Sequence, residues 1–178
     1  MDVLVGYATA HGSTEGVADR IAARLGASGA KVTLAKLVDI DDVGPFDATI
    51  IGSAVHSGQW LPEAELFVDA HASALAARPT WLFSVCSVGE TNSFFSERVG
   101  GYLTKARKDS KPLSRWLALF GADHHRYFTG MVQRGDWPGL GTLFLRAMGG
   151  SFGDHRDWAD IEAWADSIGL VLAPEDKG

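Results

Sequence analysis

The sequence has a single cysteine, Cys86, so the chain cannot form an internal disulfide. It also lacks any apolar run near the roughly 18 residues that a membrane-spanning helix needs. The apolar start of the chain, Met1 to Val5, has none of the basic residues that open a secretory signal. Together these absences predict a cytoplasmic protein.

Linkers and internal repeats are absent as well. No Pro/Ser-rich stretch interrupts the 178 residues, and 46% of them are hydrophobic, as in ordinary globular domains. A chain of this length can bury a core without a metal or a disulfide. We expect a single domain over residues 1–172 and a loose C-terminal tail over residues 173–178.

Short apolar strands alternate with helical patterns along the chain. Strands are expected over residues 3–8, 31–37, 48–55, 80–88 and 125–132, and helices over residues 14–28, 62–78, 93–108, 113–120, 140–148 and 158–168. Residues 38–47 fit a loop or a distorted helix. This alternation predicts an α/β fold with a doubly wound parallel sheet and helices on both faces.

Common catalytic motifs are missing. The sequence has no G-x-x-x-x-G-K-[ST] phosphate loop, no G-x-G-x-x-G dinucleotide fingerprint, and no G-x-S-x-G, H-E-x-x-H or C-x-x-C motif. His124 and His125 are adjacent, so within a strand they would point to opposite faces. No carboxylate or cysteine cluster accompanies them, and we therefore expect no metal site.

The segment from Thr9 to Thr14 leaves the first buried strand and enters a helix. At the carboxyl end of a parallel strand, backbone N–H groups and hydroxyls form a favourable anion site. The segment holds three hydroxyls, one imidazole and Gly12, but no Lys or Arg. This composition favours a phosphate monoester held by neutral donors over a triphosphate. The alternative is a helix capped by Ser13 or Thr14 without a ligand.

Thr9-Ala10-His11-Gly12-Ser13-Thr14 resembles the FMN phosphate loop of the flavodoxin family, although His11 departs from the usual pattern. Residues 51–60 resemble the second flavin loop, and residues 84–89 stand where that family places its third. Residues 128–131 and 148–158 extend the likeness. It is nearest to the flavodoxin-type, menaquinone-dependent protoporphyrinogen oxidases, and it implies a flavodoxin-like five-stranded parallel sheet of order 2-1-3-4-5.

The resemblance implies FMN as the cofactor, with its phosphate on the first loop and its isoalloxazine ring between the second and third loops. The implied cofactor-binding residues are Thr9, Ala10, His11, Gly12, Ser13, Thr14, Ser53, Ala54, Val55, Ser57, Gly58, Gln59, Trp60, Ser87, Val88, Gly89, Glu90 and Asn92. The family places a glycine peptide near the reactive nitrogen of the flavin, and the resemblance implies that the Gly58 peptide changes conformation with the redox state of the flavin.

Three further side chains each have two interpretations. Trp60 is the expected aromatic that stacks on the flavin, and core packing is its alternative. His56 is the candidate catalytic residue, as a proton donor to a substrate or to the flavin edge, and a solvent-facing loop histidine is its alternative. Cys86 follows Val85 in a buried strand, which favours a small core residue over a reactive thiol.

Three functions remain open. The first is an FMN oxidoreductase that moves electrons between a reduced substrate, such as a porphyrinogen, and a quinone-type acceptor. The second is an electron carrier that serves a redox partner and turns over no substrate of its own. The third is the same fold binding a deazaflavin coenzyme in place of FMN.

The net charge of −6 makes the chain a poor general nucleic-acid binder, but the charge is unevenly distributed. Residues 98–146 carry nine basic and three acidic side chains. These side chains form either a solvated face or a docking surface. A docking surface would allow the protein to make peripheral contact with the inner face of the membrane. Residues 133–139 and 149–158 are less basic than in the oxidase group, which argues against membrane docking and porphyrinogen binding. The sequence leaves the oligomeric state open.

Overall fold

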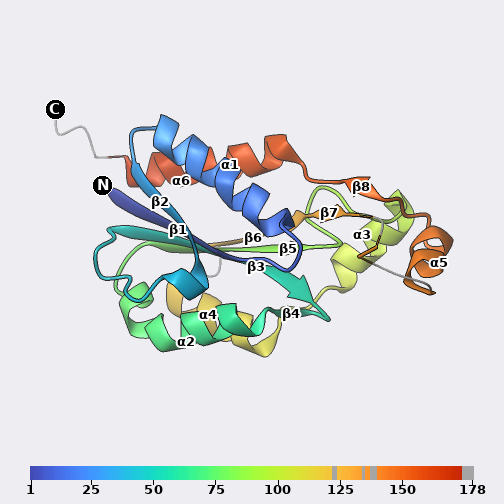
Figure 1. The fold of residues 1–178 in the computed structure, drawn as a ribbon, viewed down its shortest axis with the longest axis horizontal. Coiled ribbons are helices and arrows are strands. Elements are labelled where there is room, and N and C mark those ends of the chain that lie inside the picture. Colours follow the sequence, from blue (N-terminus) through green and yellow to red (C-terminus); the bar gives the residue numbers. More distant parts are fainter. Residues whose placement is uncertain (122–123, 134, 137–139, 174–178) are drawn as a thin grey trace.

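The structure is a computed structural model that describes residues 1–121, 124–133, 135–136 and 140–173. Arg134 of the basic stretch and residues 174–178 of the expected tail lie outside the described residues. The chain forms a central sheet with helices on both faces (Figure 1). This is the α/β architecture that the alternating pattern predicts.

Five parallel strands form the body of the sheet. They are β1 (Asp2–Ala8), β2 (Lys31–Lys36), β3 (Ala48–His56), β5 (Thr80–Cys86) and β6 (His125–Thr129). Their order is β2-β1-β3-β5-β6, which confirms the expected order 2-1-3-4-5 when these five are counted along the chain. A further short strand, β4 (Gln59–Trp60), pairs antiparallel with the end of β3. Two residues are too few to show a strand pattern, so the sequence does not reveal β4.

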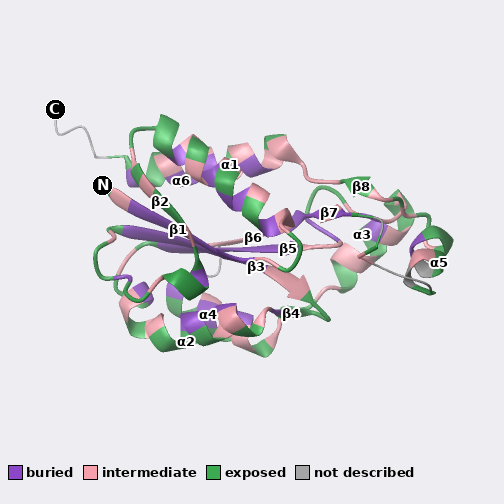
Figure 2. Ribbon diagram, in the orientation of Figure 1, coloured by how far each residue is buried: buried purple, intermediate pink, exposed green. Residues whose placement is uncertain are grey.

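Helices cover both faces of this sheet. Helices α1 (Ser13–Ala27) and α6 (Trp158–Leu172) lie on one face, and α2 (Pro62–Ala76) and α4 (Lys111–Phe120) lie on the other (Figure 1). Strands β1, β3 and β5 are therefore buried along most of their length, whereas the edge strand β2 is largely exposed (Figure 2). Continuous apolar runs in the central strands are the sequence counterpart of this burial.

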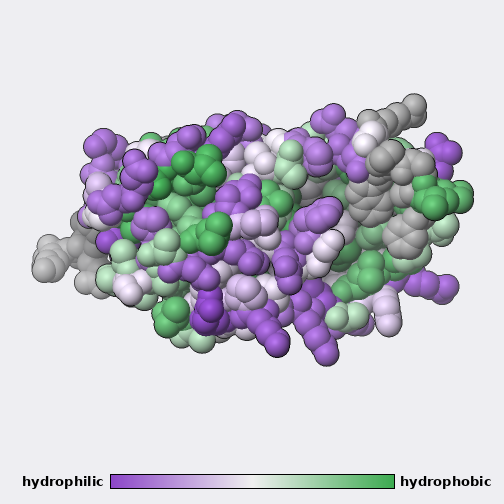
Figure 3. All heavy atoms as spheres, turned by 60° about the horizontal axis from the view of Figure 1, so that its bottom comes forward, coloured by the Kyte–Doolittle hydropathy of each residue, from purple (hydrophilic) through white to green (hydrophobic). Residues whose placement is uncertain are grey.

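The face formed by α2 and α4 is shown in Figure 3. Hydrophilic side chains are spread over it between smaller hydrophobic patches. Leu66 of α2 and Leu119 of α4 are exposed apolar residues of these helices. Beneath them, Trp116 and Phe67 belong to the buried cluster that packs the helices on the sheet. This face is thus a solvated one with a conventional core beneath it.

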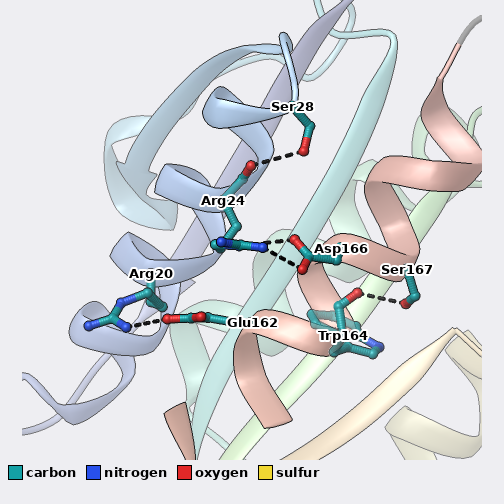
Figure 4. Close-up of polar contacts among 7 residues, drawn as sticks. All are labelled: Arg20, Arg24, Ser28, Glu162, Trp164, Asp166 and Ser167. Atoms are coloured by element: carbon teal, nitrogen blue, oxygen red, sulfur yellow. Dashed lines mark hydrogen bonds and ion pairs between the residues drawn. The ribbon is translucent and has the colours of Figure 1, made fainter. Parts of the chain in front are cut away.

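Helices α1 and α6 lie side by side on the opposite face (Figure 4). Arg20 pairs with Glu162 at 2.5 Å, and Arg24 pairs with Asp166 at 2.5 Å. All four side chains are partly exposed, so each pair contributes only about 0.2–1 kcal/mol. The apolar residues between the helices, such as Ile161, supply most of the stabilisation through burial.

Local signals fix several helix ends. Gly29 follows α1 with φ 93°, a backbone conformation that favours glycine. Pro62 begins α2, where its missing N–H costs nothing. The side chain of Asp157 accepts a hydrogen bond from the N–H of Asp160 and caps α6.

Several elements begin or end a few residues from their expected bounds, and two differ more. The helix expected from residue 93 begins later, as α3 (Glu97–Ala106), because Ser93 pairs with Val88 in an antiparallel bridge. The strand expected over residues 125–132 ends at Thr129. After Gly130 the chain forms β7 (Met131–Val132), which pairs with β8 (Gly153–Asp154) outside the main sheet. Helix α5 (Leu140–Ala147) lies at this end of the molecule (Figure 1). A short 3₁₀ helix, η1 (Leu37–Asp39), overlaps the start of residues 38–47, which are otherwise a loop.

Candidate functional site

The carboxyl ends of the parallel strands meet at one edge of the sheet. Ala8 lies opposite Ser53, Ala54 lies opposite Val85, and Cys86 of β5 pairs with the end of β6. The three segments expected to bind a cofactor follow β1, β3 and β5, so they all start from this edge. In open α/β sheets, ligands bind at such an edge.

In the first loop, Thr9 to Thr14, the side chain of Thr9 bonds to the backbone of Gly12. Thr9 Oγ1 accepts a hydrogen bond of 3.0 Å from the N–H of Gly12, which adopts φ 83°. Gly12 precedes α1, so the loop ends at free N–H groups and the positive end of a helix dipole. Ala10 and His11 are exposed on the outside of the loop.

Thr14 has a buried hydroxyl that the described part of the protein leaves unpaired. The residue is fully buried, and its hydroxyl oxygen has no hydrogen-bond partner among the described residues. An unpaired buried hydroxyl costs about 1–3 kcal/mol, and such groups are rare in native proteins. The donor set of hydroxyls and backbone N–H groups fits the phosphate of a flavin mononucleotide.

The hydroxyl of Ser13 already makes one hydrogen bond within the protein. Its hydroxyl oxygen accepts a hydrogen bond of 2.8 Å from the N–H of Met131, in the segment that leaves β6. The hydroxyl proton remains available as a donor, because a serine hydroxyl both donates and accepts. The first loop is therefore braced by a segment far away in the sequence.

The second loop is the tight turn between β3 and β4. Ser57 has φ 52° and Gly58 has φ 80°, and both are exposed, as are His56 and Gln59. Among the described residues, no hydrogen bond joins this turn to the first or third loop. The backbone groups of the turn thus face solvent, where a ligand could meet them. Ala54 and Val55 are half-buried before the turn.

Trp60 and Ser53 are structural in this arrangement. Trp60 is only 4% exposed, donates a hydrogen bond of 2.7 Å from Nε1 to Ser84 Oγ, and packs on Trp116 at 5.3 Å between ring centroids. The burial and these contacts favour the core-packing interpretation of Trp60 over stacking on a flavin. Ser53 is fully buried, donates to Ala54 O at 2.8 Å and accepts from the N–H of Leu61 at 3.0 Å.

The third loop, residues 87–92, folds over the end of β6. Thr129 Oγ1 accepts a hydrogen bond from the N–H of Gly89 at 2.9 Å. The N–H of Glu90 donates to Tyr127 O, and Glu90 Oε1 accepts from the N–H of Tyr127. The side-chain amide of Asn92 donates to the carbonyl of His155 at 2.9 Å.

The side chains of Glu90 and Asn92 are therefore committed to protein contacts. Glu90 also forms an ion pair with Arg126 at 3.1 Å, and Arg126 in turn pairs with Asp160. The backbone of Ser87 and the buried Val88 continue directly from β5. The loop is thus a rigid wall at the sheet edge.

Two cavities adjoin the second and third loops. The larger, of about 390 Å³, is lined by Glu90, Thr91, Asn92, Ser93, Phe95, Glu97, Gly100, Gly101 and Thr104. The smaller, of about 60 Å³, is lined by Val55, Gly58, Trp60, Ser84, Cys86, Arg107, Lys108, Ser110, Leu113 and Tyr127. A substrate placed beside the third loop would meet mostly polar groups.

Buried titratable groups stand next to the smaller cavity. Burial lowers the pKa of His125 to about 4, and its Nε2 lies 2.9 Å from Ser84 Oγ. Burial also raises the pKa of the Cys86 thiol, which donates to Val88 O at 2.9 Å. Since the thiolate is the reactive form, this cysteine behaves as a small core residue rather than a nucleophile.

Neither histidine of the adjacent pair joins a metal cluster. His124 stacks on Trp81 and its Nδ1 lies 3.0 Å from Thr80 O, while His125 is turned to Ser84. In the described part of the chain, no group of three or more His, Cys, Asp or Glu side chains could hold a metal ion. A search of the same residues finds no helix with the length and hydropathy needed to cross a membrane.

Arg156 is a residue at this edge that the sequence did not single out. An ideal Cβ placed on Gly16, in the first part of α1, would lie 2.3 Å from Arg156 Nη1. The guanidinium therefore rests on the helix that the first loop enters. No local sequence signal could have found this contact, because it joins residues 140 positions apart.

Comparisons with known proteins agree with this geometry. The family model described as a flavodoxin domain matches residues 4–133. Oxidised flavodoxin 2 from Bacillus cereus matches with a TM-score of 0.63 and 18% identity over 97% of this chain and 100% of that one. Oxidised flavodoxin 1 from the same organism matches with a TM-score of 0.59 and 13% identity over 98% and 100%.

Part of a larger protein has a similar fold. Rubredoxin oxygen:oxidoreductase from Desulfovibrio gigas matches with a TM-score of 0.55 and 19% identity, over 96% of this chain and 36% of that one. This chain thus spans about a third of that protein's length. A search of curated proteins finds no match. At these identities, the solved structures establish the fold alone.

Proposed function

The chain belongs to the flavodoxin domain family, and on this premise we propose that it binds FMN and transfers electrons. The observation that carries the proposal is the buried, unpartnered hydroxyl of Thr14 at the start of α1. With the Thr9–Gly12 closure and the free N–H groups of the helix, it supports a phosphate monoester on the first loop. FMN, when bound, supplies reversible electron transfer, and the protein positions and tunes it.

The remaining residues have definite tasks in this proposal. The exposed turn at Ser57–Gly58 and the wall formed by Ser87 to Asn92 would flank the isoalloxazine ring with backbone donors and acceptors. His56 is exposed in the same turn and is the proposed proton donor at the flavin edge. Trp60 supports the turn from below through its hydrogen bond to Ser84.

We further propose that the protein is an oxidoreductase that passes electrons from a reduced substrate to a quinone-type acceptor. The cavity of about 390 Å³ beside the third loop offers room for a second reactant. Its lining includes the carboxylate of Glu97 and that of Glu90, which is paired with Arg126, and among the described residues it offers no cationic side chain to the propionate groups of a porphyrinogen. A neutral quinone is therefore the better-matched reactant of the two.

The same lining favours one alternative, a carrier without its own substrate. Because the cavity does not suit an anionic tetrapyrrole, electron exchange at the exposed Ser57–Gly58 turn would serve a protein partner instead. Arg98, Lys105, Lys108 and Lys111 are exposed on and between α3 and α4. We propose these as the docking face for a redox partner, with a cytoplasmic location and membrane contact as a further hypothesis.

The test starts with the visible spectrum of the purified full chain before and after addition of FMN. A two-band flavin spectrum that survives gel filtration supports the cofactor. Uptake of a deazaflavin but not of FMN would show that the site binds a deazaflavin coenzyme in place of FMN. If neither binds, the proposal is wrong.

A second experiment separates the enzyme from the carrier. The flavin-loaded protein is reduced, then mixed with menaquinone analogues, with porphyrinogen as donor, and with acidic redox proteins. Saturable reoxidation by a quinone supports the oxidoreductase. Electron exchange with a protein partner and none with quinones supports the carrier.

A further inference from the structure

Arg156 lies against α1, the helix that follows the Thr9–Thr14 loop. Its side chain is 12% exposed although arginine is normally a surface residue. It approaches α1 at Gly16, the residue whose N–H makes the first helical hydrogen bond, to Gly12 O at 3.2 Å. A Cβ at Gly16 would lie 2.3 Å from Nη1, so a larger residue at this position would displace the guanidinium from its present place.

The guanidinium is held by three contacts. Nε and Nη2 donate to the two carboxylate oxygens of Asp154 at 2.8 Å and 2.7 Å. The Cζ atom of Arg156 lies 4.3 Å from the ring centroid of Trp158. The third nitrogen, Nη1, has no hydrogen-bond partner among the described residues and is the one beside Gly16. A fixed arginine with a free donor pair therefore faces the first turn of α1.

The charge of the guanidinium adds to the positive end of the α1 dipole. The N-terminal turn of a helix carries a partial positive charge, so a guanidinium beside it raises the energy of the folded state. Asp154 offsets part of this charge, but its side chain is 40% exposed and is therefore partly screened. An anion on the first loop would be attracted by both the helix and Arg156.

We propose that Arg156 supplies the positive charge that the Thr9–Thr14 loop lacks and makes the site selective for phosphorylated ligands. The inference rests on the proposed function, because the ligand is the phosphate of a flavin mononucleotide. Arg156 acts as a positioning and specificity residue one helical turn from the loop. The unpaired hydroxyl of Thr14 is independent support, since it marks the same turn as incomplete without a ligand.

A merely structural role is the competing explanation, and Arg20 provides a matched control. Its guanidinium lies 4.5 Å from the centroid of the same Trp158 ring, and it is ion-paired with Glu162 at 2.5 Å. It stands one turn further from the loop than Gly16. Substitution of Arg20 therefore removes the same kinds of contact, a ring contact and an ion pair, away from the helix start.

The experiment compares FMN with riboflavin, which lacks the phosphate. The full chain is freed of flavin, and dissociation constants are measured by quenching of flavin fluorescence for the wild type, Arg156→Gln, Arg156→Lys and Arg20→Gln. We expect Arg156→Gln to weaken FMN binding about tenfold and to change riboflavin binding less than about twofold, since the lost attraction is to phosphate. Arg156→Lys should retain part of the preference, and Arg20→Gln all of it.

The salt dependence gives a second readout. FMN affinity should fall with increasing NaCl less steeply in Arg156→Gln than in the wild type, because one charge has left the site. Equal losses for FMN and riboflavin, or a selectivity loss of the same size in Arg20→Gln, would overturn the inference.

Failure of the proposed function would be recognised separately. If the wild type binds neither flavin, inorganic phosphate replaces FMN, and the melting temperature is followed as phosphate is added. A rise in the wild type and in Arg20→Gln but not in Arg156→Gln would still support the anion site. No difference between the variants would end the inference.

Discussion

Ser13 and Met131 are joined by a hydrogen bond of 2.8 Å, from the N–H of Met131 to the Ser13 hydroxyl oxygen. The bond connects the start of α1 to the segment after β6, 118 residues away. It directs the remaining proton of Ser13 for donation to another acceptor. The geometry of the Thr9–Thr14 loop therefore depends on a segment far from it in the sequence.

Gly130→Ala should disturb this connection. An added Cβ would lie 2.8 Å from Ser13 Oγ and 3.0 Å from Val85 Cγ1, so the chain must shift. We expect a loss of about 1–3 kcal/mol in the free energy of unfolding, measured with urea, and weaker FMN binding. Gly101→Ala is the control, because no atom lies within 4 Å of its Cβ and α3 should gain about 0.5–1 kcal/mol. Equal stability of the two variants would contradict the contact.

Thr14→Val should have opposite effects on the empty and the loaded protein. Valine keeps the shape but removes the unpaired hydroxyl, so the flavin-free protein should be more stable by about 1 kcal/mol. FMN affinity should fall about tenfold or more, since a hydrogen bond to a charged phosphate is lost. Thermal unfolding and fluorescence titration measure the two effects.

Thr49→Val is the matched control for that experiment. Thr49 Oγ1 lies 2.7 Å from Thr80 Oγ1 in the buried sheet, so its hydroxyl is paired. The substitution should destabilise the protein by about 1 kcal/mol and leave FMN binding unchanged. A Thr14→Val variant that behaved in the same way would show that its hydroxyl has no ligand.

Trp60→Phe separates core packing from flavin stacking. The variant loses the hydrogen bond to Ser84 and part of the contact with Trp116, so stability should fall by about 2–3 kcal/mol. Because the ring is buried, FMN affinity should change less than about threefold. A large loss of affinity at nearly full stability would restore the stacking interpretation.

Much of the fold can be predicted from the sequence, because it depends on local patterns. Strands β1, β3 and β5 are apolar runs, and Gly29, Pro62 and Asp157 mark helix ends through their own backbone or side-chain chemistry. The position of the three loops follows from the sheet order.

The candidate site is only partly predictable for a different reason. The burial of Trp60 depends on Ser84 and Trp116, and the position of Arg156 depends on Gly16. Such contacts join distant parts of the chain and leave no periodic pattern. The break at Gly130 is similar, because β7 leaves the sheet to pair with β8, which lies beyond α5.

The stability of the protein should depend on pH through His125. Burial holds its pKa at about 4 in the folded state, below the ordinary value of 6.5. Its neutral form therefore stabilises the fold fully above pH 6.5, and this contribution is lost as the pH falls towards 4. The loss between pH 7 and pH 5 should be about 2 kcal/mol.

Urea unfolding at several pH values tests this prediction against His125→Gln, which cannot titrate. The carboxylates that face arginine or lysine, such as Asp166 and Asp2, have lowered pKa values and lose their stabilisation at more acidic pH. The two proteins should therefore differ in slope between pH 6.5 and pH 5. Parallel slopes in this range would show that His125 is not buried as a neutral group.

The course of residues 87–92 along β6 also has a consequence for self-association. An open edge strand presents unpaired backbone groups to which the sheet of another molecule can add. At Tyr127 both backbone groups are already occupied by Glu90. At the opposite edge, β2 carries Lys31 and Lys36, whose charges oppose the approach of a second strand. Residues 87–92, which wall the candidate cofactor site, thus also oppose the addition of another strand at Tyr127.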